Sequence, residues 1–509
     1  MSITRNLLMG STALVGLTAF AQNTNKPNII FILCDDMGYG DLACYGQPYI
    51  QTPNIDRMAS EGMLFTQAYA GSPVSAPSRA TLMTGQHTGH THVRGNKEYW
   101  KGRPQQQYGV TQEPDRVGQE PYDPNHVILP EIMKANGYTT GMFGKWAGGY
   151  EGSVSTPKTR GIDEYYGYIC QYMAHRYFPN FLNRYSPRRG DKDVIRITMD
   201  ENVKYSDGCT NPDYAKRTQY SGDMIHQEAL EWLDLQTKDK PFYGLFTYTL
   251  PHAELYQPND SILQAYYGKF CNDKTFGGTD RYHATINTHA QFAAMITRLD
   301  AYVGEIMDKL KEKGLDDNTI LIFSSDNGPH EEGGADPDFF GRDGKLQGKK
   351  RSCLEGGIRI PFIVRWPGHV KAGSVNNHML AFYDIMPTFC DLIGQENYIE
   401  KFGNKKVEND YFDGISFAPT LLGKDGQKEH DFLYWEFHET NQMGVRKGDW
   451  KLYVERGKCK LFNLANDIHE DHDVSAQHPE VVKELVKIIY EQHTTPDVNE
   501  FKTVTLPQR

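Results

Sequence analysis

Short apolar runs alternate with longer amphipathic patterns along most of the chain, and this alternation limits the possible folds most strongly. Runs such as Asn28–Cys34 (NIIFILC) have no polar side chain at alternate positions, which predicts strands buried on both faces. Further strands are predicted at 138–143, 242–249 and 319–325, and helices at 127–136, 222–236, 290–313 and 382–393. Strands that alternate with helices favour an α/β fold with a mainly parallel sheet.

Polar residues follow these strands where each strand ends. In chain order they are Asp35-Asp36, Lys145, His252 and Asp326-Asn327. Ligands of parallel α/β sheets bind beyond the carboxyl ends of the strands. We therefore expect these side chains to meet at one edge of the sheet.

The acidic members of this set predict a metal site. The pair Asp35-Asp36 by itself is more typical of a solvated turn or a helix cap than of a metal site. Asp326 and Asn327 at a second strand end favour a metal, because carboxylates held together need a cation. An all-oxygen donor set suits Ca²⁺ or Mg²⁺ better than zinc. Ca²⁺ is preferred here, because adjacent ligands seldom satisfy the strict octahedron of Mg²⁺.

The segment Ser75-Ala76-Pro77-Ser78-Arg79 precedes a run of good helix formers that ends at Gly85. It has the pattern of an ordinary helix start, with a Ser cap and Pro in the first turn. The same geometry would place residue 75 in the positive field of a helix N-terminus, with Arg79 one turn further on. That arrangement suits an anion.

The alternation of apolar runs with helical patterns ends at about residue 403. Short runs at 432–437, 443–446, 450–454 and 460–464 predict antiparallel strands separated by turns, and a helix is predicted at 480–492. We expect a catalytic domain over residues 22–403 and a smaller α+β domain with an antiparallel sheet over residues 404–509.

Composition and the N-terminus restrict the partners and the compartment. With 54 Lys and Arg against 65 Asp and Glu, the net charge is −11, which argues against a nucleic-acid partner. An anionic substrate would need basic residues gathered in one pocket. Arg5, the apolar stretch 7–20 and Ala19-Phe20-Ala21 predict a signal peptide over residues 1–21, with an uncleaved anchor as the alternative.

No other run is long enough for a stable membrane span, so we expect an exported, periplasmic protein of a Gram-negative bacterium. The 8 cysteines are too sparse for a disulfide scaffold, although they could include a bridge.

An ordered set of motifs resembles the formylglycine-dependent sulfatases. The signature is Ser75-x-Pro77-Ser78-Arg79, followed by Leu82 and Thr84-Gly85. The other matches are Asp35–Asp41, Thr52–Asp56, Gly144-Lys145-Trp146, Pro251-His252, Ser325–Gly328, and Lys350 with Glu355-Gly356-Gly357. Segment Val445–Lys451 also resembles a family segment, one without a catalytic role. Each match is weak alone, but their order and spacing are specific.

The resemblance implies an alkaline-phosphatase-like fold and oxidation of Ser75 to formylglycine (3-oxoalanine). The hydrated aldehyde attacks sulfur with one hydroxyl, and loss of the other proton then expels sulfate. By the same resemblance, the metal ligands are Asp35, Asp36, Ser75, Asp326 and Asn327, and the catalytic residues are Ser75, Arg79, Lys145, His252 and Lys350. Arg79 would steady the hydrated aldehyde. The two lysines would bind sulfate oxygens, and His252 would protonate the leaving oxygen.

Two positions depart from the family pattern. Ser75 replaces the Cys of many members, so activity would require a maturation enzyme that oxidises Ser. Ala147 stands where many members have His. We hypothesise that His92, Arg94 or His330 supplies the missing polar contact.

The substrate is expected to be a sulfated glycan. Eight aromatic residues between 165 and 185 surround His175 and Arg176, a composition that suits either a sugar ring or local packing. We expect removal of O-sulfate from galactose or N-acetylgalactosamine units, with His175, Arg176, His330 and Asp338 as substrate contacts.

The alternatives are a single-metal phosphoesterase or phosphonate hydrolase of the same superfamily, and a silent glycan-binding homologue. A two-zinc enzyme would need His in place of Asn327.

Overall fold

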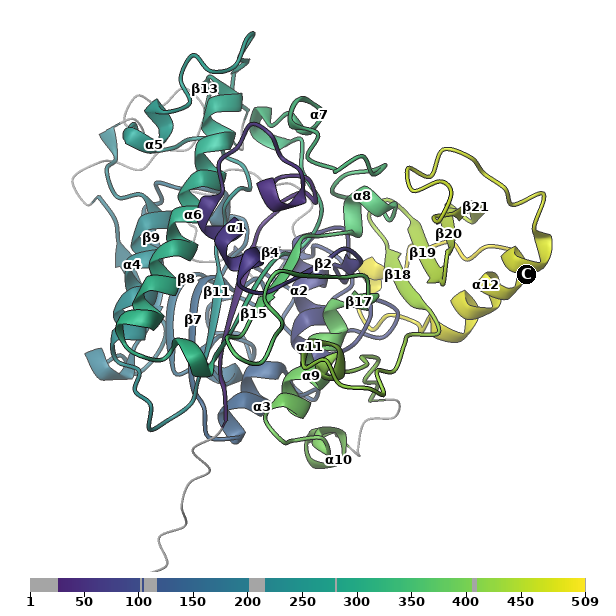
Figure 1. Ribbon diagram of the computed structural model, residues 1–509, viewed down its shortest axis with the longest axis horizontal. Coiled ribbons are helices and arrows are strands. Elements are labelled where there is room, and N and C mark those ends of the chain that lie inside the picture. Colours follow the sequence, from purple (N-terminus) through teal and green to yellow (C-terminus); the bar gives the residue numbers. More distant parts are fainter. Residues whose placement is uncertain are drawn as a thin grey trace, which may run out of the picture.

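The computed structural model describes residues 26–100, 103–104, 117–200, 216–279, 282–404 and 410–508. The predicted signal peptide and Cys209 lie outside the described residues. A large body contains the long sheet, and a smaller unit with its own sheet lies at one end of it (Figure 1).

Ten strands form the large sheet in the order β10-β9-β8-β7-β11-β1-β14-β15-β2-β16. Its centre is parallel and consists of β8 (Glu164–Tyr168), β7 (Thr139–Lys145), β11 (Phe242–Thr247), β1 (Asn28–Cys34) and β14 (Thr319–Ser325). The flanking strands, which include the antiparallel pairs, are β9 (Phe181–Tyr185), β10 (Ile195–Thr198), β15 (Phe362–Arg365), β2 (Met63–Phe65) and β16 (Ser374–Asn376). The predicted α/β class is confirmed, and the four predicted strands are all in the parallel centre.

Helices cover both faces of the sheet, and strand β1 shows why. Ile30 and Ile32 pack into one buried cluster, whereas Ile29, Phe31 and Leu33 pack into another. The first cluster includes side chains from α1 (Pro53–Ser60), α4 (Ser221–Asp234) and α6 (Thr288–Glu312). The second includes side chains from α2 (Ser75–Thr84), α3 (Leu129–Ala135) and α9 (Ile385–Leu392). A strand between two helical layers needs apolar residues at every position.

Shorter elements connect these layers. The strand pairs are β3 (Ala68–Tyr69) with β17 (Leu380–Ala381) and β12 (Thr275–Phe276) with β13 (Thr285–Ile286), and a three-stranded sheet holds β4 (Glu98–Trp100), β5 (Arg103–Pro104) and β6 (Val117–Gln119). The short helices are α5 (Ser261–Gln264), α7 (Pro337–Phe340), α8 (Glu355–Ile358), α10 (Tyr398–Phe402) and α11 (Ala418–Leu421).

The C-terminal unit is an antiparallel sheet with one long helix. Its strands are β18 (Leu433–Phe437), β19 (Gln442–Lys447), β20 (Trp450–Glu455) and β21 (Lys458–Asn463). Helix α12 (Pro479–Gln492) packs on one face of this sheet. The other face packs against the body through a buried cluster that includes Trp435, Phe437 and Val74.

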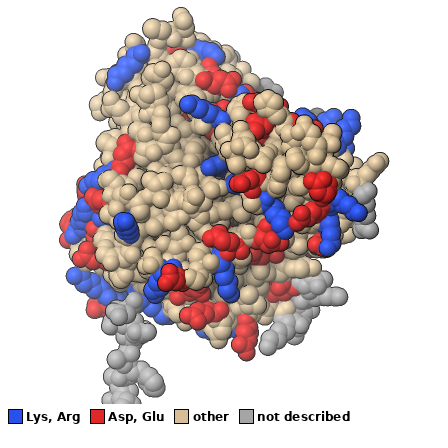
Figure 2. Space-filling view, turned by 45° about the vertical axis from the view of Figure 1, so that its right-hand side comes forward, with Lys and Arg blue, Asp and Glu red and all other residues tan. Residues whose placement is uncertain are grey.

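Acidic and basic side chains are mixed over the face shown in Figure 2, where the described residues form no broad field of one sign. Within the described ranges, no helix combines the length and apolar character that crossing a membrane requires. The seven described cysteines are free thiols.

Candidate active site

The ends of β1 and β14 bring the predicted acidic residues together. Cys34 pairs with Ser325 in the parallel register, so the residues that follow each strand are neighbours. The backbone N–H of Asp36 donates to Asp326 Oδ1 at 3.1 Å. The side-chain amide of Asn327 donates to Asp36 Oδ1 at 2.7 Å. The expected convergence at one sheet edge is therefore present in the structure.

Ser75 joins this group from helix α2. It is the first residue of the helix, and the N-cap position is Val74. Its hydroxyl donates to Asp35 Oδ1 at 2.7 Å and lies 3.5 Å from Asn327 Oδ1. Because the side chain faces the carboxylates, it does not act as the helix cap that the local sequence also allowed.

A basic side chain pairs with each of the three carboxylates. Lys145, the last residue of β7, forms an ion pair with Asp35. Arg79, one turn along α2, lies 2.8 Å from Asp326 Oδ2 and also donates to the backbone oxygen of residue 145 at 3.1 Å. Lys350 donates to Asp36 Oδ2 at 2.8 Å. The basic residues that an anionic substrate requires are thus gathered in one place.

Burial makes these charges interact strongly. The carboxylate residues Asp35, Asp36 and Asp326 are at most 1% exposed. Burial acts to raise the pKa of Asp35, but Lys145 and the other cations outweigh it and hold this pKa well below its ordinary value. Burial and the charge of Asp35 raise the pKa of Asp326 to about 6. Such a group of carboxylates favours a bound cation.

His252 lies beside Lys350 after strand β11. Its Nδ1 contacts the carbonyl oxygen of Ala253 at 2.5 Å, and its Nε2 lies 2.9 Å from Lys350 Nζ. The ring stacks on His175 at 4.5 Å and on His330 at 5.3 Å between centroids. Burial and the charge of Lys350 lower the pKa of His252. With Nδ1 directed to the carbonyl oxygen of Ala253, Nε2 is the ring nitrogen that faces Lys350 and the carboxylate of Asp36.

A small cavity of about 30 Å³ opens at this group. The residues that line it are Ser75, Asn96, Glu98, Lys145, Gln171, His175, His252, Glu332, Lys350 and Arg351. Sequence reasoning missed Asn96, Glu98, Gln171, Glu332 and Arg351. Glu332 lies in the polar stretch between Asn327 and Lys350, and Arg351 directly follows Lys350, which was the available signal. The other three carry no motif that would single them out.

Glu332 contributes a carboxylate to the cavity wall beside Lys350. It lies 3.3 Å from Lys350 Nζ and 2.8 Å from Arg351 Nη1, and it accepts the hydroxyl of Tyr282 at 2.8 Å. Burial opposes ionisation, but Lys350 and His252 hold the pKa of Glu332 well below its ordinary range. The side chain is therefore an ionised acceptor within the cavity wall.

The four predicted substrate contacts lie in different places. His175 lines the cavity, with its Nδ1 buried. His330 stacks behind His252, and its Nε2 contacts the carbonyl oxygen of Pro251 at 3.1 Å. Arg176 pairs with Glu254 at 3.4 Å. Asp338 is on the surface and pairs with Lys349 at 3.1 Å.

Two of the side chains expected to replace the His absent at Ala147 lie elsewhere. His92 pairs with Glu120 at 3.4 Å, and Arg94 donates to Glu436 at 2.8 Å. Both line a separate cavity of about 290 Å³. Of the three hypothesised residues, His330 is the one that the structure places beside His252.

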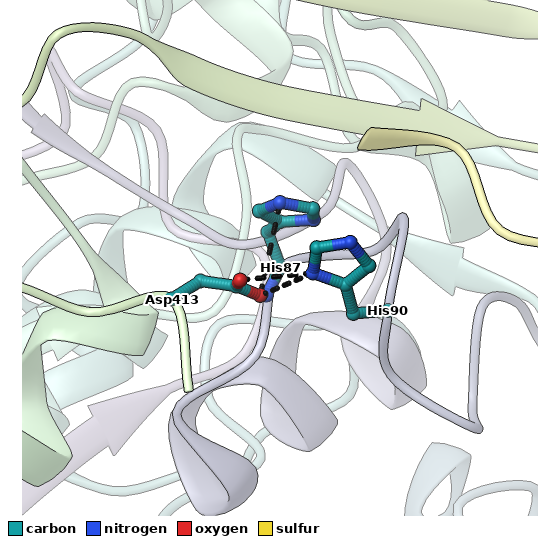
Figure 3. Close-up of side chains that lie close together, drawn as sticks. All are labelled: His87, His90 and Asp413. Carbon is teal, nitrogen blue, oxygen red and sulfur yellow. Dashed lines mark hydrogen bonds and ion pairs between the residues drawn. The ribbon is translucent and has the colours of Figure 1, made fainter. Parts of the chain in front are cut away.

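The acidic cluster fits a hard metal ion by the chemistry of its donors, because Asp35, Asp36, Asp326 and Asn327 offer carboxylate and amide oxygens. A second group of possible ligands is His87, His90 and Asp413 (Figure 3). There the N–H of residue 89 donates to His87 Nδ1 at 3.1 Å, and His87 Nε2 lies 3.1 Å from Gln492 Oε1. Both ring nitrogens of His87 are thus engaged, and the group ties two loops together.

The fold and the site together define a hydrolase of charged esters. A hydroxyl at a helix N-terminus lies against a carboxylate cluster with metal-ligand chemistry, and two lysines line the cavity at this point. This arrangement can activate a nucleophile, bind an anion and protonate a leaving group.

Comparisons with known proteins agree with this class. Residues 27–395 match the family described as Sulfatase, and residues 347–495 match the C-terminal region of N-sulphoglucosamine sulphohydrolase. The chain belongs to the sulfatase family, within the alkaline-phosphatase-like superfamily, and is a sulfuric ester hydrolase.

Relatives with assigned activities cover most of the chain. An N-acetylgalactosamine-6-O-sulfatase of Bacteroides thetaiotaomicron is 29% identical over 92% of this chain and 93% of its own length. The N-acetylgalactosamine-6-sulfatase of Sus scrofa is 31% identical over 88% of this chain and 74% of its own. Among solved structures, Ps i-CgsB in complex with k-i-k-neocarrahexaose has a TM-score of 0.69 and 28% identity, covering 93% of this chain and 94% of its own.

Proposed function

We propose that the protein removes O-sulfate from galactose or N-acetylgalactosamine units of a sulfated glycan, with formylglycine at position 75 as the nucleophile. The observation that carries this proposal is the Ser75 hydroxyl, 2.7 Å from Asp35 Oδ1 in a buried group of carboxylates and basic residues. The activities named for the relatives support a sulfated carbohydrate as substrate.

The metal would be Ca²⁺, held by Asp35, Asp36, Asp326, Asn327 and residue 75, with Mg²⁺ as the alternative. When bound, the cation draws electron density from the sulfate oxygens and from the nucleophilic oxygen. The adjacent ends of β1 and β14, which bring these residues together, support this assignment.

The basic residues would bind the sulfate group. Lys145 and Lys350 both line the cavity, the first paired with Asp35 and the second with Asp36. Each lysine can therefore direct its ammonium group to a sulfate oxygen. Arg79 would orient the oxygen of residue 75. Charges placed before reaction stabilise the charge that develops in the transition state.

His252 would deliver the proton to the leaving oxygen of the sugar. Lys350 Nζ lies 2.9 Å from His252 Nε2, so the two groups can share one proton at that position. The hydrogen bond from Nδ1 to the carbonyl of Ala253 fixes the orientation of the ring. Loss of sulfate would then leave a free hydroxyl on the glycan.

The cavity wall suits a neutral, hydroxyl-rich sugar. Asn96 and Gln171 offer amides, and Glu98 and Glu332 offer carboxylates, next to the residues assigned to sulfate. Carboxylates accept hydrogen bonds from sugar hydroxyls but repel a second sulfate or a uronate. The proposed substrate unit therefore carries one sulfate at the position that enters the cavity.

The proposal includes export to the periplasm by the segment 1–21 and a maturation enzyme that accepts Ser. Both can be tested with protein isolated from its native host. The mature N-terminus is expected at Gln22.

The deciding experiment combines mass spectrometry with a desulfation assay. The peptide that carries residue 75 should be two hydrogens lighter than the encoded Ser peptide. The same preparation should release sulfate from 6-O-sulfated N-acetylgalactosamine or galactose. An unmodified Ser75 in a preparation that hydrolyses a phosphate ester but releases no sulfate would instead favour a phosphoesterase. An unmodified protein that hydrolyses neither ester would favour a glycan-binding homologue.

A further inference from the structure

The turn formed by residues 347–357, called the lysine turn below, carries Lys350 into the active site. On its inner side, the N–H of Lys350 donates to the carbonyl oxygen of Pro329 at 2.8 Å, and the N–H of Arg351 donates to that of Pro73 at 3.0 Å. Pro329 is two residues from Asn327, and Pro73 is two residues from Ser75. The position of this turn therefore decides where the Lys350 ammonium lies relative to the nucleophile and the carboxylates.

The outer side of the lysine turn contacts the C-terminal sheet. Gln442, the first residue of β19, accepts the N–H of Cys353 through its Oε1 at 2.9 Å. The hydroxyl of Thr440 donates to the carbonyl oxygen of Arg351 at 3.2 Å. Figure 1 shows α8, in which the turn ends, between the body and strands β18 and β19. Two backbone groups of the turn are thus held by side chains from the other unit.

A buried ionic cluster secures the end of the turn. Lys451 of β20 donates to Glu355 Oε1 at 2.8 Å and lies 3.5 Å from Glu470 Oε1. Glu470 Oε2 in turn accepts the backbone N–H of Glu355 at 2.7 Å. The side chains of Lys451 and Glu355 are 0% exposed. Glu355 therefore contacts the C-terminal unit through both its side chain and its backbone.

Further polar and apolar contacts surround Glu355 and Lys451. Tyr69 donates its hydroxyl to Glu355 Oε2 at 2.7 Å, and Arg446 of β19 contacts the same hydroxyl. Arg446 and Lys451 are the two basic ends of the segment 446–451, which the catalytic chemistry leaves without a role. Around the cluster, Cys353 and Val74 pack with Trp435 of β18 in one apolar group.

Stability alone is a weak reason for such a cluster. Replacing a buried ion pair by apolar side chains of similar size is often neutral or stabilising, because the charges lose their hydration. What this buried cluster supplies is a single geometry, since moving Lys451 away from Glu355 would leave two buried charges unpaired.

We propose that Lys451, Glu470 and Gln442 are positioning residues that hold the lysine turn so that Lys350 faces the sulfate. The kinetic part of this inference rests on the proposed function, whereas its structural part does not. Lys451 then acts on catalysis from the other unit, through Glu355 and without contact to the substrate.

The test uses three variants of the mature, formylglycine-bearing enzyme. Lys451→Met removes the central charge, and Gln442→Met removes the acceptor for the Cys353 N–H but keeps the length of the side chain. Lys447→Met is the matched control, because Lys447 lies on the same segment but is paired at the surface with Asp431 and Glu484. If Lys451→Met does not fold, Gln442→Met still decides the result.

For each variant, kcat/KM is measured with a sulfated monosaccharide, and the inhibition constant is measured with inorganic sulfate. Displacement of Lys350 should lower kcat/KM about 10-fold to 100-fold, because misplacing a catalytic group by about 1 Å costs up to this factor. The inhibition constant of sulfate should rise in parallel. It does not depend on how much enzyme is folded, so a merely structural role would not change it. Lys447→Met should stay within about twofold of the parent enzyme.

A crystal structure of Gln442→Met gives a readout that needs no activity. In this variant we expect the lysine turn and the Lys350 ammonium to shift relative to Asp36. An unshifted turn, or values of kcat/KM and of the sulfate inhibition constant within twofold of the parent in the folded variants, would overturn it. If the parent enzyme itself releases no sulfate, the proposed function fails, and the crystal structure alone decides the positioning role.

Discussion

Ser75 depends on residues from several parts of the chain for its chemical surroundings. Its hydroxyl contacts Asp35 at the end of β1 and lies near Asn327 at the end of β14, while Arg79 follows one turn along its own helix. Because this set is almost completely buried, removing one charge leaves its partner unpaired in a medium of low polarity. Single substitutions here should therefore have large effects.

Lys350→Ala should lower kcat about 10²-fold to 10³-fold, the usual effect of removing one group that stabilises transition-state charge. Steady-state kinetics on the sulfated substrate checks this expectation. Lys349→Ala is the matched control, because Lys349 pairs at the surface with Glu331 and Asp338. Equal activity of the two variants would contradict the role assigned to Lys350.

Removal of divalent metal should lower the melting temperature and abolish sulfate release. A ligand at about 100 times its Kd stabilises the folded state by about 2.7 kcal/mol, so Ca²⁺ titration after chelation should raise the melting temperature measurably. Asp36→Asn should remove most of this response. A melting temperature insensitive to both Ca²⁺ and Mg²⁺ would refute the metal site.

Strand β1 shows how much of an element the sequence predicts. Its apolar run predicts a strand buried on both faces, and the structure confirms it with residues 28–34. The helices predicted at 222–236 and 290–313 are α4 and α6, with ends that differ by one or two residues. Element ends depend on local hydrogen bonds of the terminal turns, which the periodicity of apolar residues does not report.

Phe31→Ala in β1 should lower the free energy of unfolding by about 3–5 kcal/mol, the usual cost of emptying an aromatic site in a core. The ring contacts Phe362 and Phe382, each with a centroid distance of 6.3 Å. Chemical denaturation measures the change. Tyr49→Ala, at a side chain that is 57% exposed, should change stability by less than about 0.5 kcal/mol. A similar loss in both variants would argue against the two-layer core.

The two units of the molecule meet at a group whose charge depends on pH. Burial and the charge of Glu355 raise the pKa of Glu470 to about 7, against the effect of Lys451. The folded state therefore favours the protonated carboxyl. This contribution to stability is fully present below the ordinary pKa of 4.5 and is lost as the pH rises through about 7.

Glu470→Gln should flatten this dependence, since an amide does not ionise. Between pH 5 and pH 8 the free energy of unfolding should fall less in the variant than in the parent, by roughly 1.4 kcal/mol for each unit of pKa shift removed. Urea unfolding at the two pH values measures the difference. Glu484→Gln, at the surface of α12, serves as the control and should keep the slope of the parent. An unchanged slope in Glu470→Gln would contradict a raised pKa.

The sequence by itself determined the α/β class, the strands whose ends carry the acidic residues, and the meeting of Asp35 with Asp326 at one sheet edge. These follow from local periodicity and from the rule that parallel strands end on the same side. The tertiary structure alone decided that Glu332, Gln171 and Arg351 line the cavity, and that the segment 446–451 contacts the lysine turn. Loop residues far apart in the chain have no periodic pattern, because their positions are set by burial and hydrogen bonds to distant elements.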